Sequence, residues 1–275
     1  LDQATAQRID AAAAAVLQQT GVPSASIAVV RDGRIVYAQA YGSAELEPKV
    51  LRARPAMRYA IGSISKQFTA SALLLLQQDG KLSLDDKVAK YFPQLTRANE
   101  ITIRQLLTHT SGYQDYWPQD YTFAEMRQPT QPAAIVDRWA RQPLDYEPGM
   151  RWQYSNTGYV LAGLIVEKVS GEPLCRFLER RIFEPLGIES ASDFDNEPLA
   201  HGTVPGYESY ALGPPRASGH SGPGWLFGAG GLAMNAEDLA RWNISLIDRT
   251  VLDSASYREL ETEVLLKNGA GTDYA

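Results

Sequence analysis

The chain has 275 residues, of which 44% are hydrophobic and 21% charged, a composition typical of a globular protein with enough length for a large core. Its formal net charge is -6 and its basic residues are scattered, which argues against nucleic acid or an anionic membrane as a partner. No apolar run approaches the roughly 20 residues that cross a bilayer, so we expect no membrane span. Cys175 is the only cysteine, which excludes an intrachain disulfide, and we expect it to be a small buried apolar residue.

The first part of the chain predicts one helix followed by a hairpin. Residues 2–19 carry apolar side chains at helical spacing. Residues 25–30 and 35–41 then alternate around the dipeptide Asp32-Gly33, which indicates two antiparallel strands joined by a tight turn. No second sheet is evident further along the chain.

The rest of the chain reads as helical segments separated by stretches rich in Pro, Gly and Tyr. Residues 63–78 have helical periodicity and stop at Gly80. Further helices are predicted at residues 103–107, 132–140, 157–169, 174–183 and 236–247.

Ser63 and Lys66 form an S-x-x-K pattern at the start of the predicted helix 63–78. This spacing puts the hydroxyl and the amine on one helix face, with Cβ atoms about 5–6 Å apart. A serine needs a base to become a nucleophile, and a lysine can serve when burial and the positive end of a helix lower its pKa. The same helix end offers backbone N–H groups to an oxyanion. The alternative is an N-cap serine beside a solvated lysine.

Tyr154, Ser155 and Asn156 place three polar side chains in a turn before the predicted helix 157–169. A tyrosine hydroxyl near a cationic lysine can relay a proton, and an asparagine amide can hold a substrate carbonyl while contacting a lysine or a serine. The alternative is a tyrosine packed in a loop, with Ser155 or Asn156 capping the helix.

Together these elements resemble the serine β-lactamase and penicillin-binding protein family, specifically its class C β-lactamase, D-alanyl-D-alanine carboxypeptidase and esterase branch. The resemblance covers nearly the whole chain, because four blocks occur in the family's order. They are residues 61–70 (IGSISKQFTA), 106–112 (LLTHTSG), 148–159 (PGMRWQYSNTGY), and 228–232 (GAGGL) with 236–241 (AEDLAR).

The resemblance implies an α/β (α+β) fold of the β-lactamase/transpeptidase type, with an antiparallel sheet flanked by helices and a mostly helical lobe, Ser63 and Tyr154 facing the cleft between them. It implies an acyl-enzyme route, in which Ser63 attacks an amide, β-lactam or ester carbonyl and Lys66 accepts its proton. Tyr154 would protonate the leaving group before water releases the acyl group. Asn156 and Gln67 would contact a small-molecule or short-peptide substrate, and Asn156 would also steady Lys66. No metal or organic cofactor is implied.

Other arrangements compete with this interpretation. His109 and Asp115 suggest a Ser-His-Asp triad, although the resemblance makes the segment around His109 a structural turn. His201 and His220 lie in loops without metal-ligand spacing. Four aromatic residues either line a cleft or pack locally: Tyr113, Tyr116, Trp117 and Trp225. From another functional class, the alternative is a non-catalytic or acylation-only penicillin-binding or regulatory homologue.

We expect one β-lactamase-like domain over residues 1–275, with a sheet lobe made of about residues 1–60 and the C-terminal part, and a helical lobe at about 61–250. The family's third motif, Lys or His followed by Thr, Ser or Gly and then Gly, has no convincing counterpart, because His220-Ser221-Gly222 precedes the last block instead of following it. We therefore expect an incomplete chain, whose two-stranded hairpin is completed by a further segment or subunit. The resemblance implies a periplasmic or secreted setting.

Overall fold

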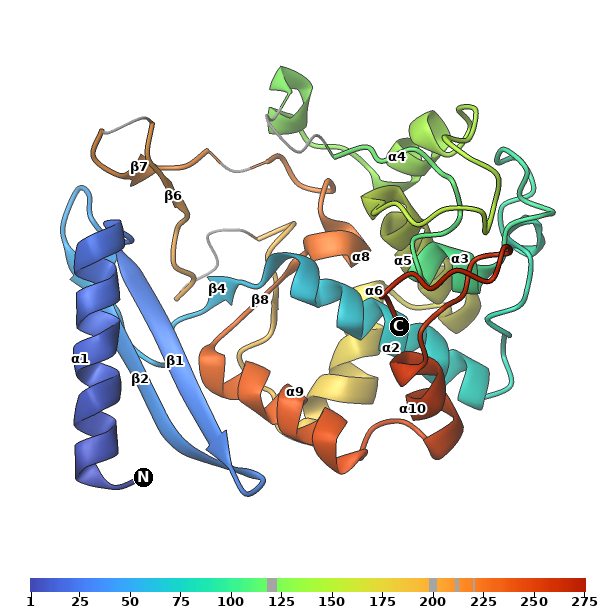
Figure 1. Cartoon of the computed structure of the whole chain (residues 1–275). Helices are drawn as coiled ribbons and strands as arrows, with labels where there is room; N and C mark the ends of the chain where they lie inside the picture. Colours follow the sequence, from blue (N-terminus) through green and yellow to red (C-terminus); the bar gives the residue numbers. More distant parts are fainter. Residues whose placement is uncertain (118–122, 198–201, 211–212, 220) are drawn as a thin grey trace. The chain divides into compact units, whose positions relative to one another are not determined.

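The computed structural model describes residues 1–117, 123–197, 202–210, 213–219 and 221–275 (Figure 1). The chain forms two compact units, each made of several chain segments. The first unit comprises residues 1–61, 183–220 and 232–248, and the second comprises residues 62–182, 221–231 and 249–275.

The first unit is built on an antiparallel pair of strands, β1 (Ser24–Arg31) and β2 (Arg34–Glu45), as the alternating pattern predicts. Asp32 and Gly33 connect them with φ angles of 52° and 70°. Two successive positive φ angles are typical of the type I′ turn, whose twist matches that of the strands. In this register Arg31 lies opposite Arg34.

A third strand, β3 (Leu51–Arg52), pairs with the far end of β2, so that Ser43 lies opposite Arg52. The expectation of a two-stranded hairpin is therefore wrong. The loop after β2 turns the chain back onto the strand that it has just left, which the sequence pattern does not show because β3 is only two residues long.

Helices α1 (Gln3–Thr20) and α9 (Ala236–Asp248) both pack against the β1–β2 hairpin and lie on either side of it (Figure 1). Tyr37 and Tyr41 project from one face of β2, because they are four residues apart in a strand. Both hydroxyls donate hydrogen bonds to the carboxylate of Asp10 on α1. Polar as well as apolar contacts thus fix this helix to the sheet.

The first unit also contains two small sheets that the sequence pattern does not predict. One has the strand order β4 (Tyr59–Ala60), β8 (Leu232–Met234) and β5 (Ser192–Asp193), and the other joins β6 (Tyr207–Glu208) to β7 (Arg216–Ala217). All of these pairings are antiparallel. The expectation that no second sheet exists is wrong, because strands of two or three residues are too short to produce a readable alternation.

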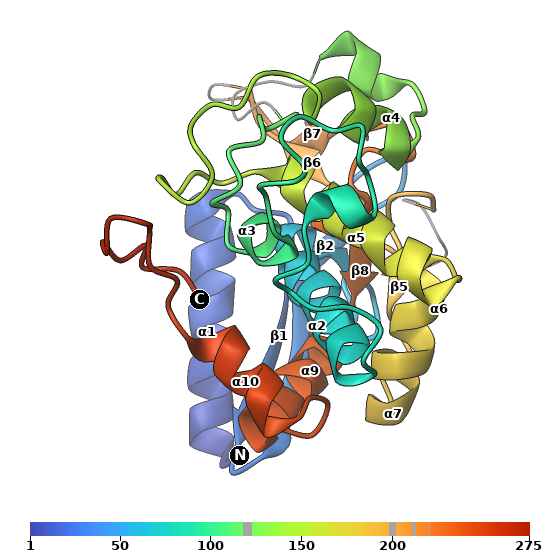
Figure 2. The same ribbon diagram turned by 90° about the vertical axis from the view of Figure 1, so that its right-hand side faces the viewer.

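The second unit is organised around α2 (Ser65–Gln78), which lies beside α5 (Asn156–Ser170) (Figure 2). Every α2 residue from Ser65 to Leu76 is buried except Gln67. A helix that is buried all round belongs to the core of a domain, as the apolar run predicts. The α-helix begins two residues later than predicted, because Gly62–Ile64 form a 3-10 turn, η1.

The helices predicted at residues 103–107, 132–140, 157–169 and 236–247 agree with the structure to within one residue at each end. Residues 174–183 are not one helix but α6 followed by a π-helical turn, and the short α7 and α8 and the largely polar α10 are not predicted at all. In the described part of the chain, no helix is long and apolar enough to cross a membrane. The helices and turns whose bounds have not yet been given are α3 (Ile103–Leu107), α4 (Pro132–Trp139), α6 (Leu174–Leu178), α7 (Glu184–Leu186), α8 (Phe227–Gly230), α10 (Ser254–Glu261), the 3-10 turns η2 (Val88–Lys90) and η3 (Ala124–Arg127), and the π-helical turn η4 (Glu179–Phe183).

Candidate active site

Ser63 lies in η1, the turn that leads directly into α2. The preceding Gly62 has a φ of 52°, in the left-handed region that a glycine adopts without strain, and this lets the chain turn sharply just before the serine. The Ser63 side chain is exposed. Its Oγ lies 3.3 Å from Lys66 Nζ and 2.8 Å from the hydroxyl of Tyr154. The structure thus brings the three predicted catalytic side chains to one point.

Lys66 is only 4% exposed, although it carries an amine. Its Nζ donates hydrogen bonds of 2.8 Å to Asn156 Oδ1 and of 2.8 Å to the carbonyl oxygen of Ala229. Burial lowers the pKa of Lys66 to about 7, and the carboxylate of Asp115 acts in the opposite direction. Near neutral pH the amine is therefore uncharged for a substantial part of the time.

The three contacts of Lys66 Nζ define where its lone pair points when the amine is neutral. A neutral amine has two N–H groups and one lone pair, whereas a carbonyl oxygen can only accept. The oxygens of Asn156 and Ala229 take both N–H groups, which leaves the third direction, toward Ser63 Oγ, for the lone pair. Lys66 is thus oriented to accept the proton of Ser63.

The carbonyl of Ala229 reaches Lys66 because α8 packs very closely against its neighbours. A Cβ on Gly228 would lie 2.8 Å from the backbone oxygen of Tyr159 on α5, a distance that real Cβ atoms essentially never show. Thr69 of α2 donates a 2.8 Å hydrogen bond to the carbonyl of Gly228. The glycine is therefore what lets the backbone of α8 approach α2 and α5.

Tyr154 supplies a hydrogen-bond donor to Ser63. Its hydroxyl donates to Ser63 Oγ, and its ring lies over Lys66 Nζ, with 4.8 Å from Nζ to the ring centroid. Burial raises the pKa of Tyr154, and the hydrogen bond to Ser63 opposes this shift. The phenol consequently stays protonated near neutral pH, which suits a group that passes a proton on.

Asn156 is the first residue of α5, and Ser155 caps this helix by accepting a hydrogen bond from Gly158 N–H. The two ends of the Asn156 amide have different partners. Its Oδ1 accepts from Lys66, and its Nδ2 donates to Asp115 Oδ2 at 3.1 Å. The start of α5 thus connects a buried amine to a half-buried carboxylate.

His109 is buried beside the site, and its ring centroid lies 4.4 Å from that of Tyr154. Its Nδ1 accepts a hydrogen bond from the backbone N–H of Ser155, and burial lowers its pKa to about 3, so the imidazole is neutral. Among the described residues His109 has no hydrogen bond to Ser63 or Asp115. The geometry therefore gives a packed histidine that supports the tyrosine, and no Ser-His-Asp relay.

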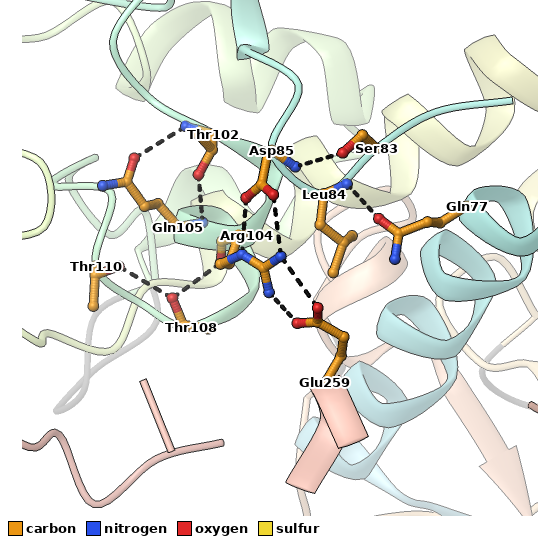
Figure 3. Close-up of polar contacts among 10 residues, drawn as sticks. All are labelled: Gln77, Ser83, Leu84, Asp85, Thr102, Arg104, Gln105, Thr108, Thr110 and Glu259. Atoms are coloured by element: carbon orange, nitrogen blue, oxygen red, sulfur yellow. Dashed lines mark hydrogen bonds and ion pairs between the residues drawn. The ribbon is translucent and has the colours of Figure 1, made fainter. Parts of the chain in front are cut away.

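A cavity of about 290 Å³ opens beside Ser63 and runs along α2. Its apolar wall includes Ala70 and Leu74 of α2. Arg104 of α3 also lines the cavity and lies between Asp85 and Glu259, as Figure 3 shows. Because the guanidinium already has two carboxylate partners, we assign it to holding α3 against α10. The cavity is large enough for a small substrate and adjoins the serine.

Comparison with known proteins identifies the family. A sequence model of the family described as Beta-lactamase matches residues 9–273. The chain belongs to the beta-lactamase family. Within this family, penicillin-binding protein 4* of Bacillus subtilis (strain 168) is 30% identical over 266 residues, which are 90% of this chain and 58% of that protein.

Solved structures share the fold of this beta-lactamase family member. The octameric penicillin-binding protein homologue from Pyrococcus abyssi has a TM-score of 0.81 at 29% identity, over 94% of this chain and 60% of that one. D-amino acid amidase from Ochrobactrum anthropi SV3, complexed with D-phenylalanine, has a TM-score of 0.82 at 27% identity, over 93% and 76%. These likenesses confirm the predicted α/β (α+β) fold. The family member spans 59% or less of the length of its first curated relatives.

Of the predicted substrate-binding residues, Gln67 is exposed on α2 and lines the cavity, whereas Asn156 lies inside beside Lys66. Both substrate contacts remain predictions. Cys175 is half-buried, so the expectation of a buried residue is wrong. His201 and His220, and with His220 the candidate third motif, lie outside the described residues. In the part of the chain that is described, no group of His, Cys, Asp or Glu side chains could hold a metal ion.

Three of the four loop aromatic residues for which the sequence left two interpretations open are packed inside the second unit: Tyr113, Tyr116 and Trp225. Tyr116, Trp139 and Trp225 form one cluster, with ring centroids 6.0 to 6.4 Å apart. The hydroxyl of Tyr116 donates to the backbone oxygen of Trp225. Tyr113 is also buried, and its hydroxyl donates to the carbonyl of Thr96. Local packing is therefore the correct interpretation for these tyrosines and for Trp225.

Two site groups could not be found from the sequence. The carbonyl of Ala229 is a backbone group, so no side-chain pattern marks it, although the small residues of block 228–232 indicate a close backbone approach. The sequence offers Asp115 only as the acid of a triad, and the structure places it against Asn156 instead.

Proposed function

We propose that this protein is a serine hydrolase that works through an acyl-enzyme, with Ser63 as its nucleophile. The observation that carries the proposal is the convergence of Lys66 Nζ and the Tyr154 hydroxyl on Ser63 Oγ, with the lysine buried. A hydroxyl with a base on one side and a proton donor on the other is the arrangement that nucleophilic catalysis needs.

In the proposed acylation step, Ser63 Oγ attacks a carbonyl carbon while its proton moves to the neutral Lys66. The low pKa of Lys66 supports this role, because a base is effective when its pKa lies near the working pH. Backbone N–H groups at the start of α2 would stabilise the oxyanion that forms on the carbonyl oxygen.

The leaving group then needs a proton, and Tyr154 is the proposed donor. Its hydroxyl contacts Ser63 Oγ and its ring lies beside the amine of Lys66. Tyr154 would give its phenolic proton to the departing atom, and the phenolate would take back the proton that Lys66 received from Ser63, which leaves both groups neutral again. A water molecule would attack the acyl-enzyme in the second half of the reaction, with the same groups acting in reverse.

The proposed substrates are small molecules or short peptides with a reactive amide, β-lactam or ester carbonyl. Penicillin-binding proteins and a D-amino acid amidase among the similar proteins favour an amide or lactam over an ester. An esterase activity remains within the proposal, because the same three side chains serve all of these carbonyls. The penicillin-binding relatives also support a periplasmic or secreted setting.

The test uses a fluorophosphonate and a penicillin as covalent probes, with the intact mass of the protein as the readout. One equivalent of label on Ser63, absent in Ser63→Ala, together with release of the penicilloyl group over time, is the expected result. Labelling without release would instead favour the acylation-only alternative. An unlabelled wild-type protein, or turnover by Ser63→Ala at a comparable rate, would contradict the proposal.

A further inference from the structure

Asp115 is a half-buried carboxylate that the proposed reaction steps do not use. Its Oδ1 accepts hydrogen bonds from the backbone N–H groups of Asn156, at 2.9 Å, and of Trp117, at 3.3 Å. Its Oδ2 accepts from Asn156 Nδ2 at 3.1 Å. All three neighbours are donors, which suits an ionised carboxylate, since a protonated one would have to donate as well.

These contacts decide which way the side-chain amide of Asn156 points. The two ends of an amide have nearly the same shape, so its orientation depends on its hydrogen-bond partners. A carboxylate accepts only, and therefore the Nδ2 end must face Asp115. The Oδ1 end then faces Lys66, where it accepts the 2.8 Å hydrogen bond.

We propose that Asp115 is a positioning residue, which holds the Asn156 amide with its oxygen toward Lys66 and so keeps the lone pair of the neutral lysine directed at Ser63. This inference rests on the proposed function of Ser63 and Lys66. If the amide turned round, its NH₂ group would face Lys66 Nζ and would donate to the lone pair that Ser63 requires.

Asp115 also acts on the charge of Lys66. The other titratable groups that face the amine are His109, which burial keeps neutral, and the phenols of Tyr154 and Tyr159, whose rings lie 4.8 and 5.4 Å from Nζ. Asp115 is thus the one anionic side chain among the described groups around Lys66. It favours the ammonium form and partly offsets the effect of burial.

The decisive variant is Asp115→Asn, which keeps the shape of the side chain. Its remaining oxygen can still accept from the backbone N–H groups of Asn156 and Trp117, but its new NH₂ group meets Asn156 Nδ2, donor against donor. We expect the Asn156 amide to turn round. The pKa of Lys66 should fall by about one pH unit or more, because a carboxylate and an accepting oxygen are both lost. Acylation should slow by about tenfold or more at its pH plateau.

Two readouts follow the change. The first is the pH dependence of acylation, whose acid limb should move to lower pH together with the pKa of Lys66. The second is a ¹³C NMR titration of Lys66 Cε, assigned by its absence in Lys66→Arg, which needs no activity. Asp145→Asn is the matched control, because Asp145 is exposed and accepts from Gln153 Nε2 without contacting Lys66. It should leave both readouts unchanged.

A second variant exchanges the two partners, Asp115→Asn together with Asn156→Asp. The donor at position 115 then meets a carboxylate at position 156, which again accepts from Lys66, so the pKa of Lys66 should return to the wild-type value or rise above it. Asn156→Asp alone places two carboxylates together and should melt at a lower temperature than the exchange.

The outcomes separate this proposal from the proposed function. A titration of Lys66 that is unchanged in Asp115→Asn, or an exchange variant whose Lys66 pKa stays below the wild-type value, would overturn the role of Asp115 even if the wild-type protein acylates normally. Failure of both variants to fold would also overturn it, because the exchange restores every hydrogen bond. A wild-type protein that does not acylate would overturn the function instead, and the NMR titration would still test Asp115.

Discussion

The carbonyl oxygen of Ala229 accepts a 2.8 Å hydrogen bond from Lys66 Nζ, although the two residues are 163 positions apart in the chain. This oxygen is one of the two, with Asn156 Oδ1, that accept from Lys66 and orient it. The orientation of the lysine therefore depends in part on how α8 packs against α2 and α5. The close approach of Gly228 to the backbone of Tyr159 makes this packing sensitive to a single methyl group.

Gly228→Ala should displace α8 and with it the Ala229 carbonyl. Overpacking of this kind costs about 1–3 kcal/mol, and the lysine loses an accepting oxygen, so both the melting temperature and the acylation rate should fall. Gly230→Ala is the control in the same helix, since the nearest atom to its added Cβ would be an ordinary 3.7 Å away. Calorimetry and acylation kinetics check the pair, and equal behaviour of the two variants would contradict the prediction.

Lys66→Ala should slow acylation by several orders of magnitude while the protein stays folded. Nucleophile and base act as one unit, so removal of the base removes most of the rate. Stopped-flow acylation by a chromogenic substrate measures the loss. Lys168→Ala serves as the control, because Lys168 bonds the carbonyl of Tyr91 and does not contact Ser63. A Lys66→Ala protein that acylates at nearly the wild-type rate would show that another group is the base.

Tyr154→Phe should keep the free energy of unfolding within about 1 kcal/mol of the wild-type value, since only one hydrogen bond is lost at a partly exposed site. Acylation of a substrate with a poor leaving group should slow by about 10²-fold or more, because the leaving group loses its proton donor. A substrate with a good leaving group should be affected less. If both substrates react at unchanged rates, Tyr154 has only a packing role.

The buried amine of Lys66 should make the stability of the protein depend on pH in a defined direction. Its pKa is about 7 in the folded state and about 10.4 in an unfolded chain, so between these values the unfolded state binds more protons. Stability should therefore rise with pH above about 7, with a contribution of at most about 1.4 kcal/mol per pH unit. Chemical denaturation of the wild type and of Lys66→Met from pH 6 to 9 tests this. The variant should lack that part of the slope, and identical slopes would show that Lys66 is not a buried titrating amine.

The sequence by itself determined the features that depend on neighbouring residues. The Asp32-Gly33 turn set the hairpin, because its backbone angles suit only a few residue types. The S-x-x-K spacing placed Ser63 and Lys66 on one helix face, and the apolar run after them predicted that α2 is buried. The four sequence blocks indicated the family, which the family model confirms.

The tertiary structure alone decided the features that depend on contacts between distant segments. Short strands such as β4 and β8 exist only because they pair with each other, and α10 has too few apolar residues to show a helical period. Asp115 determines the orientation of the Asn156 side-chain amide, and the Ala229 carbonyl helps to set the direction of the Lys66 lone pair. No sequence spacing links these residues to one another. Local propensity sets the helices and turns. The direction in which a side chain donates or accepts a proton depends instead on the oxygens next to it, and only the packed chain brings those oxygens into place.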